Sequence, residues 1–341
     1  MSEQSSRELA DLDRWLAERN VIGLWGNRVR DREECKPYLW KWQEVQECVQ
    51  AMADLVPMEM VSRRILTLLN PSLGDGTIST MRVSIQCLKP GEIAEAHRHS
   101  AGAIRFILQG AEGAHCVVQG ERVPVATGDL LTTPSMTWHD HYSEADQPAI
   151  WLDALDNRLV GKLGIKRFGE PFSAPQQPIE RPDGFADRVL GGAKPPWVTA
   201  ELPNPPFRYP WEDTLATLRY LKESEIEPDP CDGIHLAYAH PVTGGPTLTT
   251  FSCEMQLLLG RKRLVAHRHN SSTIYQVYQG HGVTVIDDQR FEWSQGDIFV
   301  VPPWSWHSHE NVASEDAMLF SLSDQPTMAA LGMYLEEEAG S

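Results

Sequence analysis

The sequence predicts an all-β protein in which two related β-barrels or β-sandwiches follow each other, behind a helical N-terminal arm. The first observation is an internal repeat with a long period: HRHSAGAIRFILQG begins at His97, and HRHNSSTIYQVYQG begins at His267. The second is a matching pair of motifs further along, GDLLTTPSMTWHDH from Gly128 and GDIFVVPPWSWHSH from Gly296. A chain of 341 residues, 41% of them hydrophobic, accommodates two medium domains of this kind.

Short β-rich runs surround the repeated motifs and predict antiparallel strands. They alternate in hydrophobicity or are continuously apolar, and Gly and Pro separate them. The N-terminal stretches 6–19 and 41–52 lack strand alternation and are rich in helix formers, so they predict helices. The predicted strands include residues 82–88, 104–108, 274–278 and 298–301.

A proline-rich stretch sets the predicted domain boundary. Ten of the 24 prolines fall within residues 171–210, and no long apolar run lies between them. We expect this segment to be a linker that is ordered by contact with its neighbours. The predicted organisation is a helical N-terminal arm (1–60), a first β domain (61–170), the Pro-rich linker (171–210) and a second β domain (211–341).

The charge of the chain disfavours some partners. Its 30 Lys and Arg against 47 Asp and Glu leave a formal charge of −17, the wrong sign for binding nucleic acid or acidic membranes. No segment approaches the roughly 20 apolar residues of a membrane span, and the start of the chain is not typical of a signal peptide. We therefore expect a cytoplasmic protein. The six cysteines form no CxxC pattern, which leaves the twelve histidines as candidate metal ligands.

The repeated histidines predict a metal site. Residues two apart in a strand point to the same face, so His97 and His99 present both imidazoles on one side of a sheet. His139 supplies a third ligand if its strand lies beside theirs. Three neutral imidazoles suit iron, zinc, copper or nickel. The second copy keeps His267, His269 and His307 and leaves metal binding open there.

The motifs resemble those of the cupin superfamily, and their duplication resembles a bicupin, with two tandem jelly-roll β-barrels. More narrowly, PGEIAEAHRHSAGAIRFILQG, TPSMTWHDH and WLDALD resemble the gentisate and salicylate 1,2-dioxygenase family of ring-cleaving enzymes. The general cupin pattern carries a Glu four or five residues after HxH. This chain has Ala103 and Ile104 there, a departure that the dioxygenase family shares.

The resemblance implies an Fe(II)-dependent enzyme that takes dioxygen and an aromatic hydroxy acid. Its reaction would open a 2-hydroxybenzoate, such as gentisate, 5-nitrosalicylate or salicylate, between the carboxyl-bearing and hydroxyl-bearing carbons. The resemblance also implies a homotetramer. By this resemblance, His141 is expected to contact the substrate and to act as a general base, with a pKa near its ordinary value. The resemblance further carries over Asp153 as an acidic residue that supports the pocket, and Arg64, or its neighbour Arg63, as a substrate contact.

Arg105 is a predicted carboxylate clamp. A three-histidine site keeps the full charge of a divalent metal and leaves roughly three positions open, which favours an anionic chelating ligand. Arg105 follows His99 by an even number of residues, so parity places it on the same interior face. Its planar guanidinium can donate two parallel hydrogen bonds to a carboxylate. Tyr275 takes its place in the second copy, so we place catalysis in the first.

Alternate residues of a strand face the same side, so we predict that Arg82, Ser84 and Gln86 line the pocket together. Relatives usually carry an aromatic residue where this chain has Arg82. An inward Arg82 would donate a hydrogen bond to an electronegative ring substituent. The sequence thus predicts a preference for 5-substituted salicylates, 5-nitrosalicylate above all, over salicylate.

Three alternative functions stay open at the level of sequence. One is a 1-hydroxy-2-naphthoate-type dioxygenase. Another is a bicupin decarboxylase or isomerase that uses manganese or zinc, although such sites commonly keep the Glu that is missing here. The third is a non-enzymatic bicupin of the storage or ligand-binding kind, a class that has usually lost the histidines.

Overall fold

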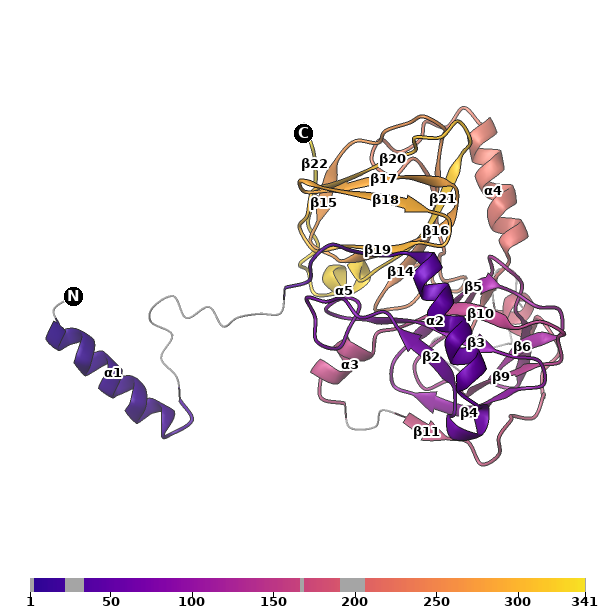
Figure 1. Ribbon diagram of the computed structural model, residues 1–341, viewed down its shortest axis with the longest axis horizontal. Helices are drawn as coiled ribbons and strands as arrows, with labels where there is room; N and C mark the ends of the chain where they lie inside the picture. Colours follow the sequence, from indigo (N-terminus) through magenta and orange to yellow (C-terminus); the bar gives the residue numbers. More distant parts are fainter. Residues whose placement is uncertain (1–2, 22–33, 166–168, 191–205, 341) are drawn as a thin grey trace. The chain divides into compact units, whose positions relative to one another are not determined.

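The computed structural model describes residues 3–21, 34–165, 169–190 and 206–340. The chain forms two compact units, Met1–Glu34 and Cys35–Ser341. The first unit contains helix α1 (Glu3–Ala17), and the second contains two β-barrels (Figure 1). In the described part of the chain, no helix is long and apolar enough to cross a membrane.

The first barrel consists of two antiparallel sheets that face each other. One sheet has the strand order β12-β8-β5-β10-β3-β2, and the other has the order β11-β4-β9-β6-β7. The strands are β2 (Arg64–Thr67), β3 (Arg82–Leu88), β4 (Ile93–His99), β5 (Ala103–Gln109), β6 (Ala114–Val118), β7 (Glu121–Pro124), β8 (Leu130–Thr133), β9 (His139–Ser143), β10 (Ala149–Leu155), β11 (Gly169–Pro171) and β12 (Arg208–Tyr209).

The second barrel repeats this plan. Its sheets have the orders β1-β19-β16-β21-β14-β13 and β18-β17-β20-β15-β22. The strands are β1 (Tyr38–Trp40), β13 (Ile234–Ala237), β14 (Ser252–Leu258), β15 (His267–His269), β16 (Thr273–Gln279), β17 (His281–Ile286), β18 (Gln289–Ser294), β19 (Ile298–Val301), β20 (His307–Glu310), β21 (Ala317–Ser323) and β22 (Glu336–Glu338).

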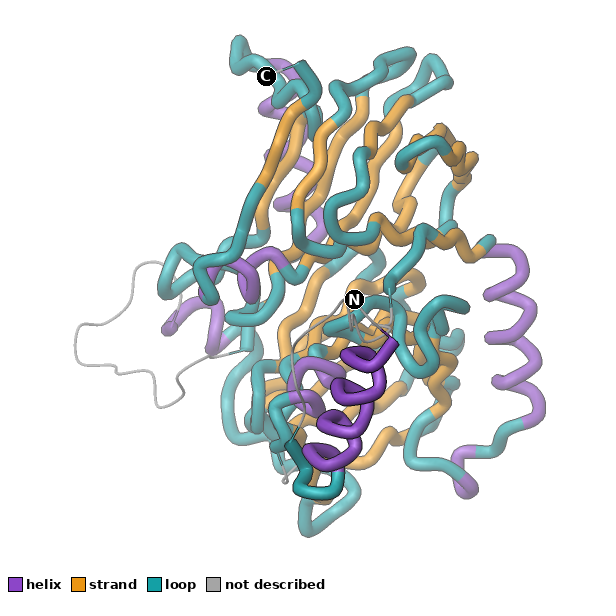
Figure 2. Tube along the Cα trace, turned by 90° about the vertical axis from the view of Figure 1, so that its left-hand side faces the viewer, coloured by secondary structure: helices purple, strands orange, loops and turns teal. Residues whose placement is uncertain are grey.

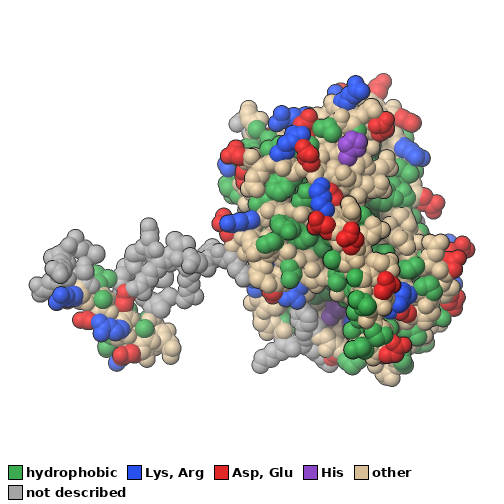
Figure 3. Space-filling view, in the orientation of Figure 1, with side chains coloured by type: hydrophobic (Ala, Val, Ile, Leu, Met, Phe, Trp, Pro, Cys, Tyr) green, Lys and Arg blue, Asp and Glu red, His purple; other side chains and the backbone are tan. Residues whose placement is uncertain are grey.

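The helices of the second unit lie outside both barrels (Figure 2). In the second unit these are α2 (Trp42–Leu55), α3 (Asn157–Lys162), α4 (Trp211–Glu223) and α5 (Gln325–Ala330). On the face drawn in Figure 3, acidic and basic side chains of the described residues are interspersed, as is usual for a surface in contact with water.

The two six-stranded sheets pack against each other and form a core that the barrels share. This core takes Val83 and Ile85 from the first barrel, and Met255 and Leu257 from the second. At its centre, the rings of Phe106 and Phe320 stack with their centroids 4.0 Å apart and their planes 2° from parallel. The barrels are therefore joined by buried apolar surface.

The segment that precedes each barrel pairs with the other barrel. Strand β1, which comes before the first barrel in the chain, pairs with β19 of the second. Strand β12, which comes before the second barrel, pairs with β8 of the first. This reciprocal exchange connects the barrels through backbone hydrogen bonds as well as through the shared core.

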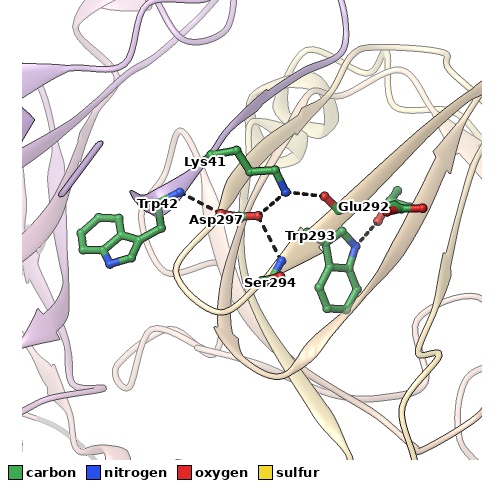
Figure 4. Close-up of polar contacts among 7 residues, drawn as sticks. Lys41, Trp42, Glu292, Trp293, Ser294 and Asp297 are labelled. Carbon is green, nitrogen blue, oxygen red and sulfur yellow. Dashed lines mark hydrogen bonds and ion pairs between the residues drawn. The ribbon is translucent and has the colours of Figure 1, made fainter. Parts of the chain in front are cut away.

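An aspartate anchors each exchanged segment. Asp297 accepts hydrogen bonds from Lys41 Nζ at 2.8 Å and from the backbone N–H of Trp42 at 2.8 Å (Figure 4). In the same way, Asp129 accepts from Arg208 Nε at 2.7 Å and from the backbone N–H of Trp211 at 2.9 Å. Carboxylates that accept charged and backbone donors make strong hydrogen bonds.

Both anchors depend on the glycine that precedes the aspartate. Gly296 has φ +90° and Gly128 has φ +87°, in the region that favours glycine. A Cβ atom would also lie 2.3 Å from Trp42 Cγ at Gly296, and 2.6 Å from Trp211 Cγ at Gly128. The repeated Gly-Asp of the sequence is thus the point where each barrel receives the exchanged segment.

Most predicted elements are found with small shifts in their ends. Strands β3 and β19 have the predicted bounds, and helices α1 and α2 occupy the two predicted helical stretches. The predicted arm also contains β1, because this segment adds a strand to the second barrel. The predicted linker packs on the first barrel, where Gln177 bonds to Asp140. Its residues 191–205 lie outside the described part of the chain.

Replacing Asp297 with Asn should lower the free energy of unfolding by about 1–3 kcal/mol. The change removes a charge and leaves donors near Trp42 and Ser294 poorly paired in a buried place. Urea unfolding of the whole protein measures this loss of stability. Lys41→Met is the matched control and should cost about 1 kcal/mol or less, because Lys41 is half exposed. Equal stability of Asp297→Asn and the wild type would contradict the anchoring role.

Candidate metal and substrate site

Three histidines come together inside the first barrel. His97 and His99 lie on β4, and His139 lies on the neighbouring strand β9, directly opposite His97. Each offers one ring nitrogen, and the three nitrogens lie within 4.8 Å of one another. The ring centroids are 4.1–5.3 Å apart. The predicted grouping of these residues is present in the structure.

The surroundings of these histidines fit a divalent metal. His99 Nδ1 lies 2.7 Å from the carbonyl oxygen of Ala101, and His139 Nδ1 lies 3.0 Å from that of Thr137. A carbonyl oxygen can only accept, so Nδ1 carries the proton and Nε2 keeps its lone pair, as a metal ligand requires. His139 Nε2 is buried and has no partner among the described residues.

The three imidazoles are neutral. Burial, followed by the charge of Arg63, lowers the pKa of His97 to about 2. Burial also lowers the pKa of His99, and it lowers that of His139 well below its ordinary value with help from the charge of Arg105. Neutral imidazole is the form that binds a metal.

Arg105 faces the histidines from the opposite sheet. It lies on β5, is 2% exposed, and its guanidinium hydrogen-bonds to Thr133. Its neighbour across the strands is Asp153 on β10. The predicted interior position is correct, but the two sides of the site belong to different sheets. Counting parity through the turn from His99 could not show this, since the turn carries the chain from one sheet to the other.

Several buried polar atoms of the first barrel have no partner in the described chain. Burying such an atom unpaired is costly, so a group of them indicates a place where a ligand or water binds. They include atoms of residues on both sheets and of Arg63, which precedes β2: Arg63 Nε, Gln86 Nε2 and Oε1, Arg105 Nε, His139 Nε2, His141 Nε2 and Asp153 Oδ1.

His141 has a partner that sequence reasoning missed. Its Nδ1 lies 2.9 Å from Cys116 Sγ on the neighbouring strand β6. Burial raises the pKa of the Cys116 thiol to about 12, so this thiol stays protonated. Burial, with the charges of Arg105 and Arg63, lowers the pKa of His141 well below its ordinary value. The expectation of a near-ordinary pKa for His141 is therefore wrong.

Arg63, and not Arg64, reaches the histidine cluster. The Arg63 guanidinium contacts His97 Nδ1 and donates to the carbonyl oxygen of Glu95 at 2.9 Å. Arg64 points to the other side of its strand, where it pairs with Glu92 and donates to the carbonyl oxygen of Val56 at 2.6 Å. The preference for Arg64 is corrected because successive residues of an extended chain face opposite ways.

The structure also corrects the predicted position of Arg82. Its guanidinium donates to Asp75, at 2.6 Å from the carbonyl oxygen and at 2.7 Å from Oδ2, and its side chain is 39% exposed. The carboxylate of Asp75 draws this long side chain away from the histidine cluster. The other two residues of the same parity are buried, and Ser84 Oγ lies 3.1 Å from Thr67 Oγ1.

Comparison with known proteins finds similar sequences and structures. The Cupin domain family matches residues 84–155 and 254–323. The chain is 41% identical over 307 residues to 5-aminosalicylate 1,2-dioxygenase of Comamonas sp, covering 89% of this chain and 81% of that protein. It is 36% identical over 365 residues to gentisate 1,2-dioxygenase of Haloferax sp, covering 99% and 100%.

Solved structures agree with these sequence matches. Salicylate 1,2-dioxygenase from Pseudaminobacter salicylatoxidans matches with a TM-score of 0.88 and 30% identity, over 98% of this chain and 99% of that chain. A structure of salicylate 1,2-dioxygenase adducts with gentisate matches with the same TM-score and identity, over 98% and 94% of the two chains.

Substitution of Arg63 and substitution of Arg64 should affect different properties of the protein. Arg63→Ala is expected to weaken the binding of a carboxylate ligand about tenfold to a hundredfold, because one charge-assisted hydrogen bond contributes about 1.5–3 kcal/mol. Arg64→Ala is expected instead to cost about 3 kcal/mol of folding stability, because Glu92 loses its buried partner. Ligand titration and urea unfolding measure the two effects. A stable Arg64→Ala protein that no longer binds the ligand would reverse the assignment.

Proposed function

The chain belongs to the bicupin gentisate 1,2-dioxygenase family, and from this premise we infer that its first barrel opens the ring of a 2-hydroxybenzoate with dioxygen. The predicted bicupin fold, with two tandem cupin domains, is confirmed. So is the predicted class of enzyme, a ring-cleaving oxidoreductase that acts on hydroxybenzoates. The roles of individual residues and the identity of the metal are our proposals.

One observation carries the placement in the first barrel. Unpaired buried donors and acceptors lie in the same barrel as the three histidines, and two of them belong to Arg63 and Arg105, whose charges lie close to His97. A 2-hydroxybenzoate has the complementary groups, a carboxylate that accepts from guanidinium and a neighbouring hydroxyl oxygen. The same molecule can therefore satisfy the unpaired atoms and approach the histidine cluster.

We propose ferrous iron as the metal held by His97, His99 and His139. Iron bound there would supply a redox-active Lewis acid through which the ring can react with dioxygen. The protein's part is to present three neutral imidazoles on one side of the barrel. The residues that would bind the substrate come from the facing sheet, from β9 beside the histidine cluster and from the segment before β2.

Arg105 and Arg63 would hold the substrate carboxylate. Arg105 is fixed by Thr133 and lies beside Asp153, so its guanidinium is oriented before the substrate arrives. Burial, followed by the nearby charge of Arg105, lowers the pKa of Arg63 to about 10, which leaves it charged at neutral pH. Two fixed cations in a buried place favour an anionic substrate.

His141 and Gln86 would complete the pocket. His141 is held by Cys116 at Nδ1, and its Nε2 has no partner within the described chain, so it can hydrogen-bond to the substrate hydroxyl. Both amide atoms of Gln86 are also unpaired and can donate and accept. The relatives named for gentisate and 5-aminosalicylate act on rings with a hydrogen-bonding group at position 5. We propose a substrate of this kind, bound at position 5 by Gln86.

Other expectations stay predictions, namely the homotetramer and the cytoplasmic location. Among the alternative functions, ring opening of 1-hydroxy-2-naphthoate stays open, because a relative that is 35% identical carries that name. The relatives are ring-cleaving dioxygenases, which disfavours the decarboxylase or isomerase and the non-enzymatic bicupin. Because Arg82 pairs with Asp75, it no longer supports the expectation that 5-nitrosalicylate is the preferred substrate.

Oxygen uptake by iron-loaded protein tests the proposed function. We expect one dioxygen to be consumed for each gentisate or 5-aminosalicylate, with a product whose mass is that of the substrate plus dioxygen. His99→Ala should abolish uptake and remove the metal from the first barrel. Salicylate, 5-nitrosalicylate and 1-hydroxy-2-naphthoate complete the panel. Release of carbon dioxide without oxygen uptake would instead support a decarboxylase.

If Arg105 binds the substrate carboxylate, its replacement by Ala and its replacement by Lys should raise KM to different extents. Arg105→Ala should raise KM for carboxylate substrates about tenfold to a hundredfold, for the loss of a hydrogen bond between charged groups. Arg105→Lys should recover only part of this, because an ammonium group lacks the planar fork. Steady-state kinetics with gentisate measure both variants. Unchanged KM in Arg105→Ala would remove this residue from the clamp.

A further inference from the structure

The second barrel holds a histidine cluster with the same geometry as the first. His267 and His269 lie on β15, and His307 lies opposite His267 on β20. Their ring centroids are 5.7, 4.1 and 5.0 Å apart, against 5.3, 4.1 and 4.9 Å in the first barrel. Their ring nitrogens also lie within 4.8 Å of one another. The scaffold thus presents two equivalent groups of imidazoles.

This second cluster is also prepared for a divalent cation. His269 Nδ1 lies 2.9 Å from the carbonyl oxygen of Ser271, and His307 Nδ1 lies 3.1 Å from that of Ser305. Their Nε2 atoms therefore keep their lone pairs. His307 is 1% exposed, and its Nε2 has no partner among the described residues.

The charge around the second cluster is the reverse of that around the first. Where the first barrel has Arg105 opposite Asp153, the second has Tyr275 opposite Ser321. The position of Ser84, opposite Asp153 on β3, is taken by Glu254, opposite Ser321 on β14. The repeat of 170 residues also places Gly233 at the position of Arg63. Both guanidinium groups are absent, and the carboxylate of Asp153 is replaced by that of Glu254 on the neighbouring strand.

A cavity of about 280 Å³ opens onto this cluster. His267 and His269 line it, and its other charged side chains are all acidic, with no Lys or Arg in the described lining. Gln256 Nε2 donates to Asp232 Oδ1 at 2.7 Å, which holds that carboxylate in the wall. The acidic residues that line the cavity are Asp229, Asp232, Glu254 and Glu336.

We propose that the second barrel is a separate metal site that binds neutral vicinal diols and excludes aromatic carboxylates. Two adjacent hydroxyl oxygens can approach a divalent cation held by the three imidazoles, and their O–H groups can donate to Glu254 and Asp232. A carboxylate ligand would instead meet like charges on the cavity wall, which opposes binding. The cavity has room for a single ring. This site does not depend on ring cleavage in the first barrel.

The experiment compares two ligands of the same ring size, catechol and salicylate, on cobalt-loaded protein without dioxygen. Cobalt(II) gives a visible spectrum that reports ligand binding at each site. His139→Ala keeps only the second site, and His307→Ala keeps only the first. We expect wild type to take up two cobalt ions per chain and each variant to take up one. Uptake of one cobalt by wild type, or none by His139→Ala, would overturn the proposal.

The spectra should then show opposite selectivity. The ratio of salicylate affinity to catechol affinity should be at least about a hundredfold lower in His139→Ala than in His307→Ala, because each like charge costs about tenfold. Equal ratios in the two variants would overturn the proposal.

A third variant keeps the test independent of whether the histidine variants fold. Glu254→Gln, in otherwise wild-type protein, should raise the affinity of the second site for salicylate about tenfold, and Glu292→Gln, an exposed residue outside the cavity, should not. No gain in Glu254→Gln, or an equal gain in Glu292→Gln, would show that the wall charge does not select the ligand. Oxygen uptake with gentisate, measured separately, reports on the first barrel alone.

Discussion

The face-to-face packing of the two six-stranded sheets is the constraint on which the rest of the structure depends. Each strand of these sheets serves two surfaces, because alternate residues point to opposite faces. On β5, Ile104 and Phe106 enter the shared core while Arg105 enters the barrel. On β10, Leu152 and Ala154 enter the core while Asp153 faces the site. A shift of one residue in register would exchange the core and the site.

The exchanged segments strengthen this arrangement from outside. Strand β1 extends a sheet of the second barrel and strand β12 extends a sheet of the first, and Asp297 and Asp129 hold their ends. These segments resist separation of the barrels, because separation would both break the backbone pairing and expose the shared core. The face of the first barrel that carries Arg105 is thus supported by the second barrel, even though the second contributes no residue to the first cluster of histidines.

The same scaffold carries two different electrostatic environments. Both barrels place three imidazoles on the strands corresponding to β4 and β9, and the distances between the rings nearly coincide. What differs lies opposite the imidazoles, where Arg105 in one barrel corresponds to Tyr275 in the other and Ser84 corresponds to Glu254. The backbone sets where a metal can bind, and the side chains opposite set which ligand can reach it.

Sequence alone determined the tandem repeat, the strands around it and the two histidine clusters, because a two-residue spacing on a strand fixes which side chains share a face. It also indicated the inward position of Arg105. The choice of Arg63 over Arg64, the pairing of Arg82 with Asp75 and the contact of Cys116 with His141 were decided only by the tertiary structure. Spacing along the chain does not specify which strands become neighbours. A long charged side chain, moreover, turns toward whichever opposite charge the folded protein brings within reach.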